Sequence, residues 1–132
     1  MKKIKISIID NFLAKEEFVS LARYLSDEEV PWHFSRFMVH PEEVSPGGFY
    51  HKVYQANVPC SPIFTSHFLP ILEQLNVVVL IRLRINLNLR LPEPYVFQFH
   101  TDVDDFSKDL ITQVTTSILY INTNNGYTEF ED

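Results

Sequence analysis

The segment from Arg82 to Arg90 alternates strictly between polar and apolar side chains, and this pattern constrains the fold more than any other feature of the chain. Even-numbered positions carry arginine or asparagine, and odd-numbered positions carry leucine or isoleucine. Because the side chains of a strand point alternately to its two faces, the segment predicts a β-strand with one polar and one apolar face. An exposed sheet surface or a wet cavity would explain the polar face, and arginines suit a cavity that receives carboxylates.

Two helices are predicted before this strand. Apolar residues at helical spacing within Ala14 to Leu25 indicate an amphipathic helix, and Asp10-Asn11 can cap it. Ser61-Pro62 predicts the start of a second helix, which runs to about Leu75. Both helices are expected to cover a sheet.

The remaining N-terminal chain is expected to be mostly irregular. Ile4 to Ile9 alternates and predicts a half-buried strand. Residues 27–60 lack a clear period, apart from a short strand near Trp32 to Phe34 and a turn at Pro46 to Gly48. Such a long irregular segment is typical either of a functional lid or binding loop or of simple disorder, and its aromatic side chains are where substrate contacts are expected.

Further strands are predicted after Arg90. Tyr95 to Thr101 and the threonine-rich segment Thr112 to Asn122 have strand propensity, and Tyr127 to Phe130 begins a return strand. Asn124-Asn125-Gly126 is typical of a tight hairpin turn with positive φ. Helices followed by consecutive strands favour an α+β class with an antiparallel sheet.

Length and composition limit the classes of protein to consider. A chain of 132 residues is expected to form a single domain, residues 1–132. Its net charge of −6 disfavours nucleic acid as a partner, because phosphates attract basic surfaces. The apolar run Val77 to Ile81 is far shorter than the roughly 20 residues that cross a bilayer, so no membrane association is expected. Cys60, the only cysteine, is predicted to be buried, and the chain is expected to be cytoplasmic.

One short motif carries metal chemistry. His100 and Asp102 are two residues apart at the end of a predicted strand, so both side chains can project to the same side. An imidazole and a carboxylate are two of the three protein ligands of a common iron(II) site. Asp102 with Asp104 and Asp105 would be an alternative calcium site, although the spacing does not match an EF-hand loop.

Four motifs occur in one order along the chain: Ile9 to Leu13 before a helix, His100-x-Asp102, Thr116 to Asn122 and Gly126-x-Thr128-x-Phe130. This order resembles the iron(II)- and 2-oxoglutarate-dependent oxygenases, in particular the prolyl-4-hydroxylase-like branch and its small phage-encoded members. The resemblance implies a double-stranded β-helix, or jelly roll, with N-terminal helices packed on the major sheet. Residues 1–75 would then be helical support, and 76–132 would be the first half of the jelly-roll core.

The resemblance also implies site residues and cofactors. His100 and Asp102 correspond to iron ligands and catalytic residues. Tyr120 corresponds to a tyrosine that binds 2-oxoglutarate, and Arg90 or Asn88 lies near a position that often contacts this cosubstrate. The expected reaction uses Fe(II), 2-oxoglutarate and O2, releases succinate and hydroxylates an unactivated C–H bond. The substrate would be a prolyl or other side chain of a protein, or a small molecule.

The chain departs from the family pattern in one respect. Relatives place a second histidine, and then a basic residue, after the Gly-x-Thr-x-Phe strand, and no histidine follows His100 here. The resemblance therefore implies truncation, with the strands that close the jelly roll missing after Asp132, and a fragment that alone is inactive. A non-catalytic jelly-roll binding module or a degenerate relative is the alternative expectation.

Overall fold

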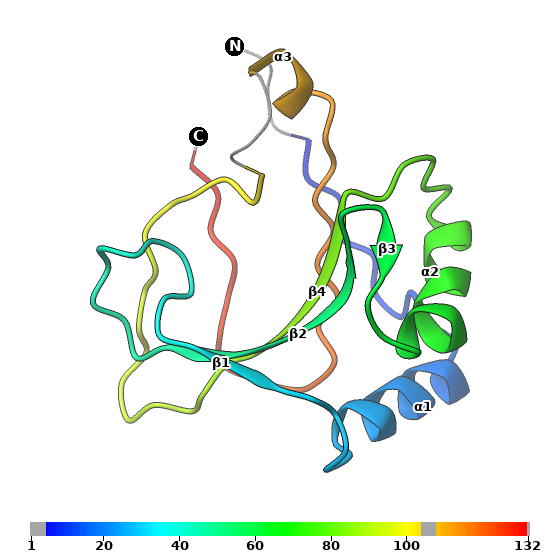
Figure 1. The fold of residues 1–132 in the computed structure, drawn as a ribbon, viewed down its shortest axis with the longest axis horizontal. Coiled ribbons are helices and arrows are strands. Elements are labelled where there is room, and N and C mark those ends of the chain that lie inside the picture. The colour runs from blue at the N-terminus through cyan, green and yellow to red at the C-terminus, as the bar shows by residue number, and fades with distance from the viewer. Residues whose placement is uncertain (1–4, 104–107, 132) are drawn as a thin grey trace.

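The computed structural model describes residues 5–103 and 108–131 (Figure 1). In chain order the elements are α1 (Lys15–Leu25), β1 (His33–Ser35), β2 (Gly48–Gln55), β3 (Val58–Pro59), the π-helical turn η1 (Phe64–Phe68), α2 (Leu69–Gln74), β4 (Arg82–Leu87) and α3 (Lys108–Ile111). This part of the chain is α+β with one small antiparallel sheet, which agrees with the predicted class.

The sheet is organised around β2. Along one edge β2 pairs with β4, from Phe49 opposite Leu87 to Gln55 opposite Arg82. Along its other edge β2 pairs with β1 at its start and with β3 at its end. Every strand pair in the described chain therefore includes β2.

The hydrophobic core lies between the helices and one face of this sheet. Its buried members come from α1, β2 and the region of η1: Leu21, Leu25, Val53, Ile63 and Phe68. Leu83 and Ile85 of β4 pack against this cluster. Since α1 and α2 lie together on this side of the sheet (Figure 1), the apolar, odd-numbered face of β4 meets the helices.

Both predicted cover helices are present, with local differences at their ends. α1 begins at Lys15, and its cap is the backbone of Ala14, whose N–H donates to the Glu17 carboxylate at 3.2 Å, so the prediction of a cap at Asp10-Asn11 is wrong. The second helix contains the π-helical turn η1, because Pro70 has no N–H to donate and the Leu69 N–H reaches back to the Phe64 carbonyl.

β2 lies inside the segment that was predicted to be irregular. Its buried face carries His51 and Val53, while Lys52 between them is exposed. A histidine on the buried face interrupts the apolar alternation that reveals a strand in a sequence. The turn residue Gly47 has φ of 72°, and a Cβ there would lie 2.8 Å from the Ser35 carbonyl oxygen, which explains glycine at this turn.

Several predicted strands are not formed in the described chain. Residues 5–9, 95–101, 112–122 and 127–130 have no assigned strand, and Ile6, Ile8 and Ile9 are exposed. Strand propensity describes the chain alone, whereas a strand also needs a hydrogen-bonded neighbour. At the predicted hairpin, the Asn124 side chain accepts the Gly126 N–H at 2.8 Å, and neither Asn125 nor Gly126 has positive φ.

Two smaller expectations concern Cys60 and the membrane. Cys60 is exposed rather than buried, because it follows the edge strand β3, and its thiol donates to the Val58 carbonyl at 3.4 Å. Among the helices of the described residues, none combines the length and the apolar character needed to cross a bilayer.

The β2–β3 hairpin turn contains a strained alanine. Ala56 and Asn57 form a two-residue loop with φ of 52° and 61°, the left-handed conformation that hairpins of this type require. Because the alanine Cβ is unfavourable in this region while asparagine tolerates it, we expect Ala56→Asn to raise the free energy of unfolding by about 0.5–1 kcal/mol. Urea denaturation measures this change. The reciprocal variant Asn57→Ala should lose a similar amount, and an Ala56→Asn protein no more stable than the parent would contradict the strain argument.

Candidate functional site

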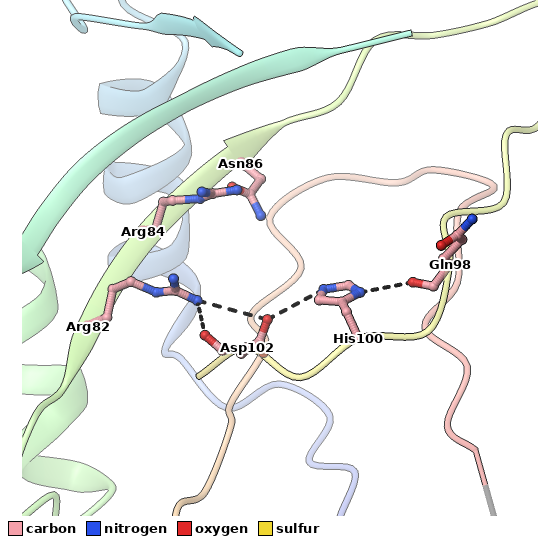
Figure 2. Close-up of polar contacts among 6 residues, drawn as sticks. All are labelled: Arg82, Arg84, Asn86, Gln98, His100 and Asp102. Atoms are coloured by element: carbon pink, nitrogen blue, oxygen red, sulfur yellow. Dashed lines mark hydrogen bonds and ion pairs between the residues drawn. The ribbon is translucent and has the colours of Figure 1, made fainter. Parts of the chain in front are cut away.

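The polar face of β4 lies opposite the segment that carries His100 and Asp102. Arg82, Arg84 and Asn86 leave the strand on the side away from the core, and Figure 2 shows Arg82 pointing toward Asp102. The split between polar and apolar faces predicted from the alternation is thus confirmed within β4, which brings arginines to the candidate metal ligands.

His100 and Asp102 lie side by side as predicted, although no strand is assigned to the segment that carries them. The His100 Nε2 is 3.7 Å from the Asp102 Oδ1, and both side chains are partly exposed, at 37% and 44% (Figure 2). This separation is too long for a direct hydrogen bond. One divalent ion such as zinc lies about 2.1 Å from each such ligand atom, so it could contact two atoms up to about 4.2 Å apart.

The backbone orients the His100 ring. Its Nδ1 lies 3.0 Å from the Gln98 carbonyl oxygen, and a carbonyl can only accept a hydrogen bond, so Nδ1 carries the hydrogen. In a neutral imidazole the lone pair is then on Nε2, the atom that faces Asp102. A histidine that ligates a metal commonly donates its other ring N–H to a carbonyl in this way.

Arg82 is the second partner of Asp102. Its Nη2 donates to the Asp102 backbone carbonyl at 2.7 Å and lies 4.0 Å from the Asp102 Oδ1. Both side chains are more than 40% exposed, so this ion pair contributes at most about 1 kcal/mol. The guanidinium would oppose a cation bound at Asp102 and would attract an anion beside it.

A second cationic group lies further along the sheet. Arg84 stands 5.1 Å from the centre of the Tyr50 ring, and its Nε donates to the Asn86 side chain at 2.7 Å. Burial, and then the neighbouring Arg82, lowers the pKa of Arg84. The sheet places Lys52 directly opposite Arg84, and like charges in this arrangement are unfavourable without an anion.

Among the described residues, no hydrogen bond or ion pair joins the other predicted site residues to His100. Tyr120 pairs its hydroxyl with the hydroxyl of Thr128. Asn88 and Arg90 are exposed and follow the end of β4 at Leu87. Of the alternative calcium ligands, Asp104 and Asp105 lie outside the described residues.

Sequence reasoning missed two residues beside the site. The His40 ring lies 6.4 Å from the His100 ring, centre to centre. The Glu43 carboxyl group is buried and accepts hydrogen bonds from the Gln98 N–H and the Tyr95 hydroxyl. Partial burial, and then the contact with Glu43, raises the pKa of Tyr95. No local pattern could identify either residue, because both contacts join segments that are far apart in the sequence.

The donors near His100 fall short of a complete metal site. Residues 5–103 and 108–131 contain no group of three histidine, cysteine, aspartate or glutamate side chains placed to hold one ion. Among the described residues, His100 and Asp102 therefore form a pair of candidate ligands and not a group of three. Comparisons with protein-family models, with curated proteins and with solved structures found no match for this chain.

Proposed function

We propose that this chain contributes the first two metal ligands, His100 and Asp102, to an iron(II)- and 2-oxoglutarate-dependent oxygenase domain with a jelly-roll core. The observation that carries the proposal is the pair itself, with Nε2 and Oδ1 3.7 Å apart and Nδ1 bound to a backbone carbonyl. Imidazole and carboxylate are the ligand types of the non-haem iron oxygenases. The bound iron would supply the oxidation of 2-oxoglutarate to succinate that is coupled to hydroxylation of a substrate carbon.

The basic face of β4 supports the same proposal. A cosubstrate with two carboxylates needs cationic partners, and Arg82 and Arg84 lie beside the candidate metal ligands (Figure 2). In this proposal they replace Arg90 and Asn88 as the residues that attract the cosubstrate. Tyr120 stays a candidate for the distal carboxylate on the basis of the family resemblance alone.

The ligand count sets the expected strength of the site. Two protein ligands bind a divalent ion weakly, and Arg82 adds repulsion, so we expect the isolated 132-residue chain to be a poor enzyme. Detection of succinate from 2-oxoglutarate by this chain, dependent on iron and O2, would overturn that expectation. The substrate, a protein side chain or a small molecule, is part of the same proposal and rests on the resemblance.

Thermal unfolding with a redox-stable metal tests the site. Mn(II) replaces Fe(II), and 2-oxoglutarate is added with it. When the ligands are present at about ten times their dissociation constant for the chain, we expect the melting temperature to rise by about 2–5 °C. His100→Ala and Asp102→Ala should each abolish the rise, because either change leaves a single ligand. His33→Ala, which removes an exposed histidine of β1, is the control and should retain it.

A non-catalytic jelly-roll binding module is the second candidate, favoured by the absence of a third ligand among the described residues. In that case His100, Asp102 and Arg82 form an ordinary exposed polar network. This candidate predicts no change in melting temperature with Mn(II) and 2-oxoglutarate for the parent chain, so the same measurement decides between the two.

A further inference from the structure

Glu43 is a buried acidic residue in a part of the molecule where most polar side chains are exposed. The residue is 8% exposed, and its Oε2 is buried without a hydrogen-bond partner among the described residues. Burying a carboxyl group away from water is unfavourable unless its oxygens are hydrogen-bonded. The buried carboxyl group of Glu43 is therefore more readily explained by the groups that it positions than by a gain in stability.

Glu43 anchors the segment of the chain that leads to His100. Its Oε1 accepts the Gln98 N–H at 3.1 Å and the Tyr95 hydroxyl at 3.2 Å. No strand is assigned to residues 95–100, so these side-chain contacts with Glu43 help to fix the segment. The Tyr95 hydroxyl also lies 3.0 Å from the Val44 carbonyl oxygen, which ties it to the same turn.

Gln98 connects Glu43 to the imidazole. Its N–H donates to Glu43, and its carbonyl accepts from the His100 Nδ1 at 3.0 Å. Both backbone polar groups of Gln98 are therefore hydrogen-bonded, the N–H to the buried carboxyl group and the carbonyl to the imidazole ring. A shift of Gln98 would misalign its carbonyl, and the ring would lose the acceptor that keeps the hydrogen on Nδ1.

The same turn also places a second imidazole. The Glu43 N–H donates to the His40 carbonyl at 3.1 Å, which closes the turn that brings the His40 ring to within 6.4 Å of the His100 ring. Glu43 thus forms hydrogen bonds with the backbone of His40 and with the backbone of Gln98, which lies two residues before His100.

We propose that Glu43 is a positioning residue for His100, which anchors Gln98 so that the His100 ring keeps its hydrogen on Nδ1 and presents the Nε2 lone pair toward Asp102. This inference deepens the proposed function, since the importance of the Nε2 lone pair rests on it. The tautomer can nevertheless be measured without metal, so the two ideas can fail separately.

Nitrogen-15 NMR of the histidine rings in the metal-free chain, at about pH 9, well above the usual pKa of an imidazole, tests the proposal. The parent should populate mainly the Nδ1–H tautomer at His100. In Glu43→Ala the ratio of Nδ1–H to Nε2–H should fall by about two- to tenfold, the range of one hydrogen bond. Glu43→Gln keeps an acceptor oxygen and should restore the ratio to within about twofold, while the exposed neighbour in Glu42→Ala should leave it unchanged.

An unchanged tautomer ratio in Glu43→Ala would overturn the proposal, as would a Glu43→Gln chain that behaves like the alanine variant. A measurement on the parent covers the case in which Glu43→Ala does not fold. The Gln98 amide should exchange with solvent at least about tenfold more slowly than an unstructured amide, because it donates to a buried oxygen. Exchange at the unstructured rate would also overturn the proposal. If Mn(II) fails to stabilise the chain while the tautomer responds as expected, the proposed function fails and the positioning role stands.

Discussion

Leu21→Ala is expected to lower the free energy of unfolding by about 2–5 kcal/mol. Leu21 is 1% exposed and belongs to the cluster that joins α1 to β2 and to the second helix. Truncation removes buried methyl groups and leaves a cavity, because the surrounding helices and sheet relax only in part. In a chain of this size that loss is a large fraction of the total stability.

Urea denaturation followed by circular dichroism measures the change, and α1 offers a matched control. Val19 lies two residues earlier on the same helix and is 37% exposed. We expect Val19→Ala to change the stability by no more than about 0.5 kcal/mol, because alanine has the higher helix propensity and little buried surface is lost. Equal losses in the two variants would mean that α1 does not pack on the sheet as described.

His51→Ala is expected to cost about 2–4 kcal/mol, the second large effect. His51 is 3% exposed, its Nδ1 donates to the Pro31 carbonyl at 3.2 Å, and its Nε2 is 2.8 Å from the Ser61 hydroxyl oxygen. The substitution creates a cavity and leaves the buried Ser61 hydroxyl and the Pro31 carbonyl without their partner. The ring also joins three segments: the chain before β1, β2 itself and the start of the second helix.

The same denaturation experiment tests this prediction. His33→Ala removes an exposed histidine of β1 and should change the stability by less than about 1 kcal/mol. Ser61→Ala should lie between the two, because it removes one hydrogen bond and a small buried hydroxyl. A His51→Ala protein as stable as the His33→Ala protein would show that these buried hydrogen bonds contribute no net stability.

The parts of the fold that were predicted correctly are those set by local pattern. The apolar stripe that contains Leu21 and Leu25 identified α1, and Ser61-Pro62 identified the second helix. β4 was clear because Leu83 and Ile85 alternate with arginines. β2 was missed, since His51 occupies its buried face, where a sequence pattern expects an apolar residue.

The C-terminal strands illustrate the opposite error. Thr112 to Asn122 has strong strand propensity, yet the structure assigns it no strand, and most of its side chains are exposed. Only Ile121 of this segment packs against the core cluster. Propensity is a property of the segment, whereas pairing depends on a partner edge that the segment does not contain.

In the candidate site, too, the sequence predicted the local contact and missed the contacts between distant segments. The proximity of His100 and Asp102 was predicted from their two-residue spacing at a strand end, and the two side chains lie side by side although no strand is assigned there. The contact with Arg82 needed the position of β4, and the anchor at Glu43 comes from 55 residues before Gln98. Contacts between residues so far apart in the sequence depend on the tertiary fold.

The central place of β2 makes the sheet a single cooperative unit. Among the described residues, β1, β3 and β4 have no hydrogen-bonded neighbour except β2, so detachment of β2 breaks every strand pair in one event. That event also removes Val53 and His51 from the buried interior. Opening of the sheet and exposure of the interior are therefore one transition, and the amide hydrogens of all four strands should report a common free energy of opening.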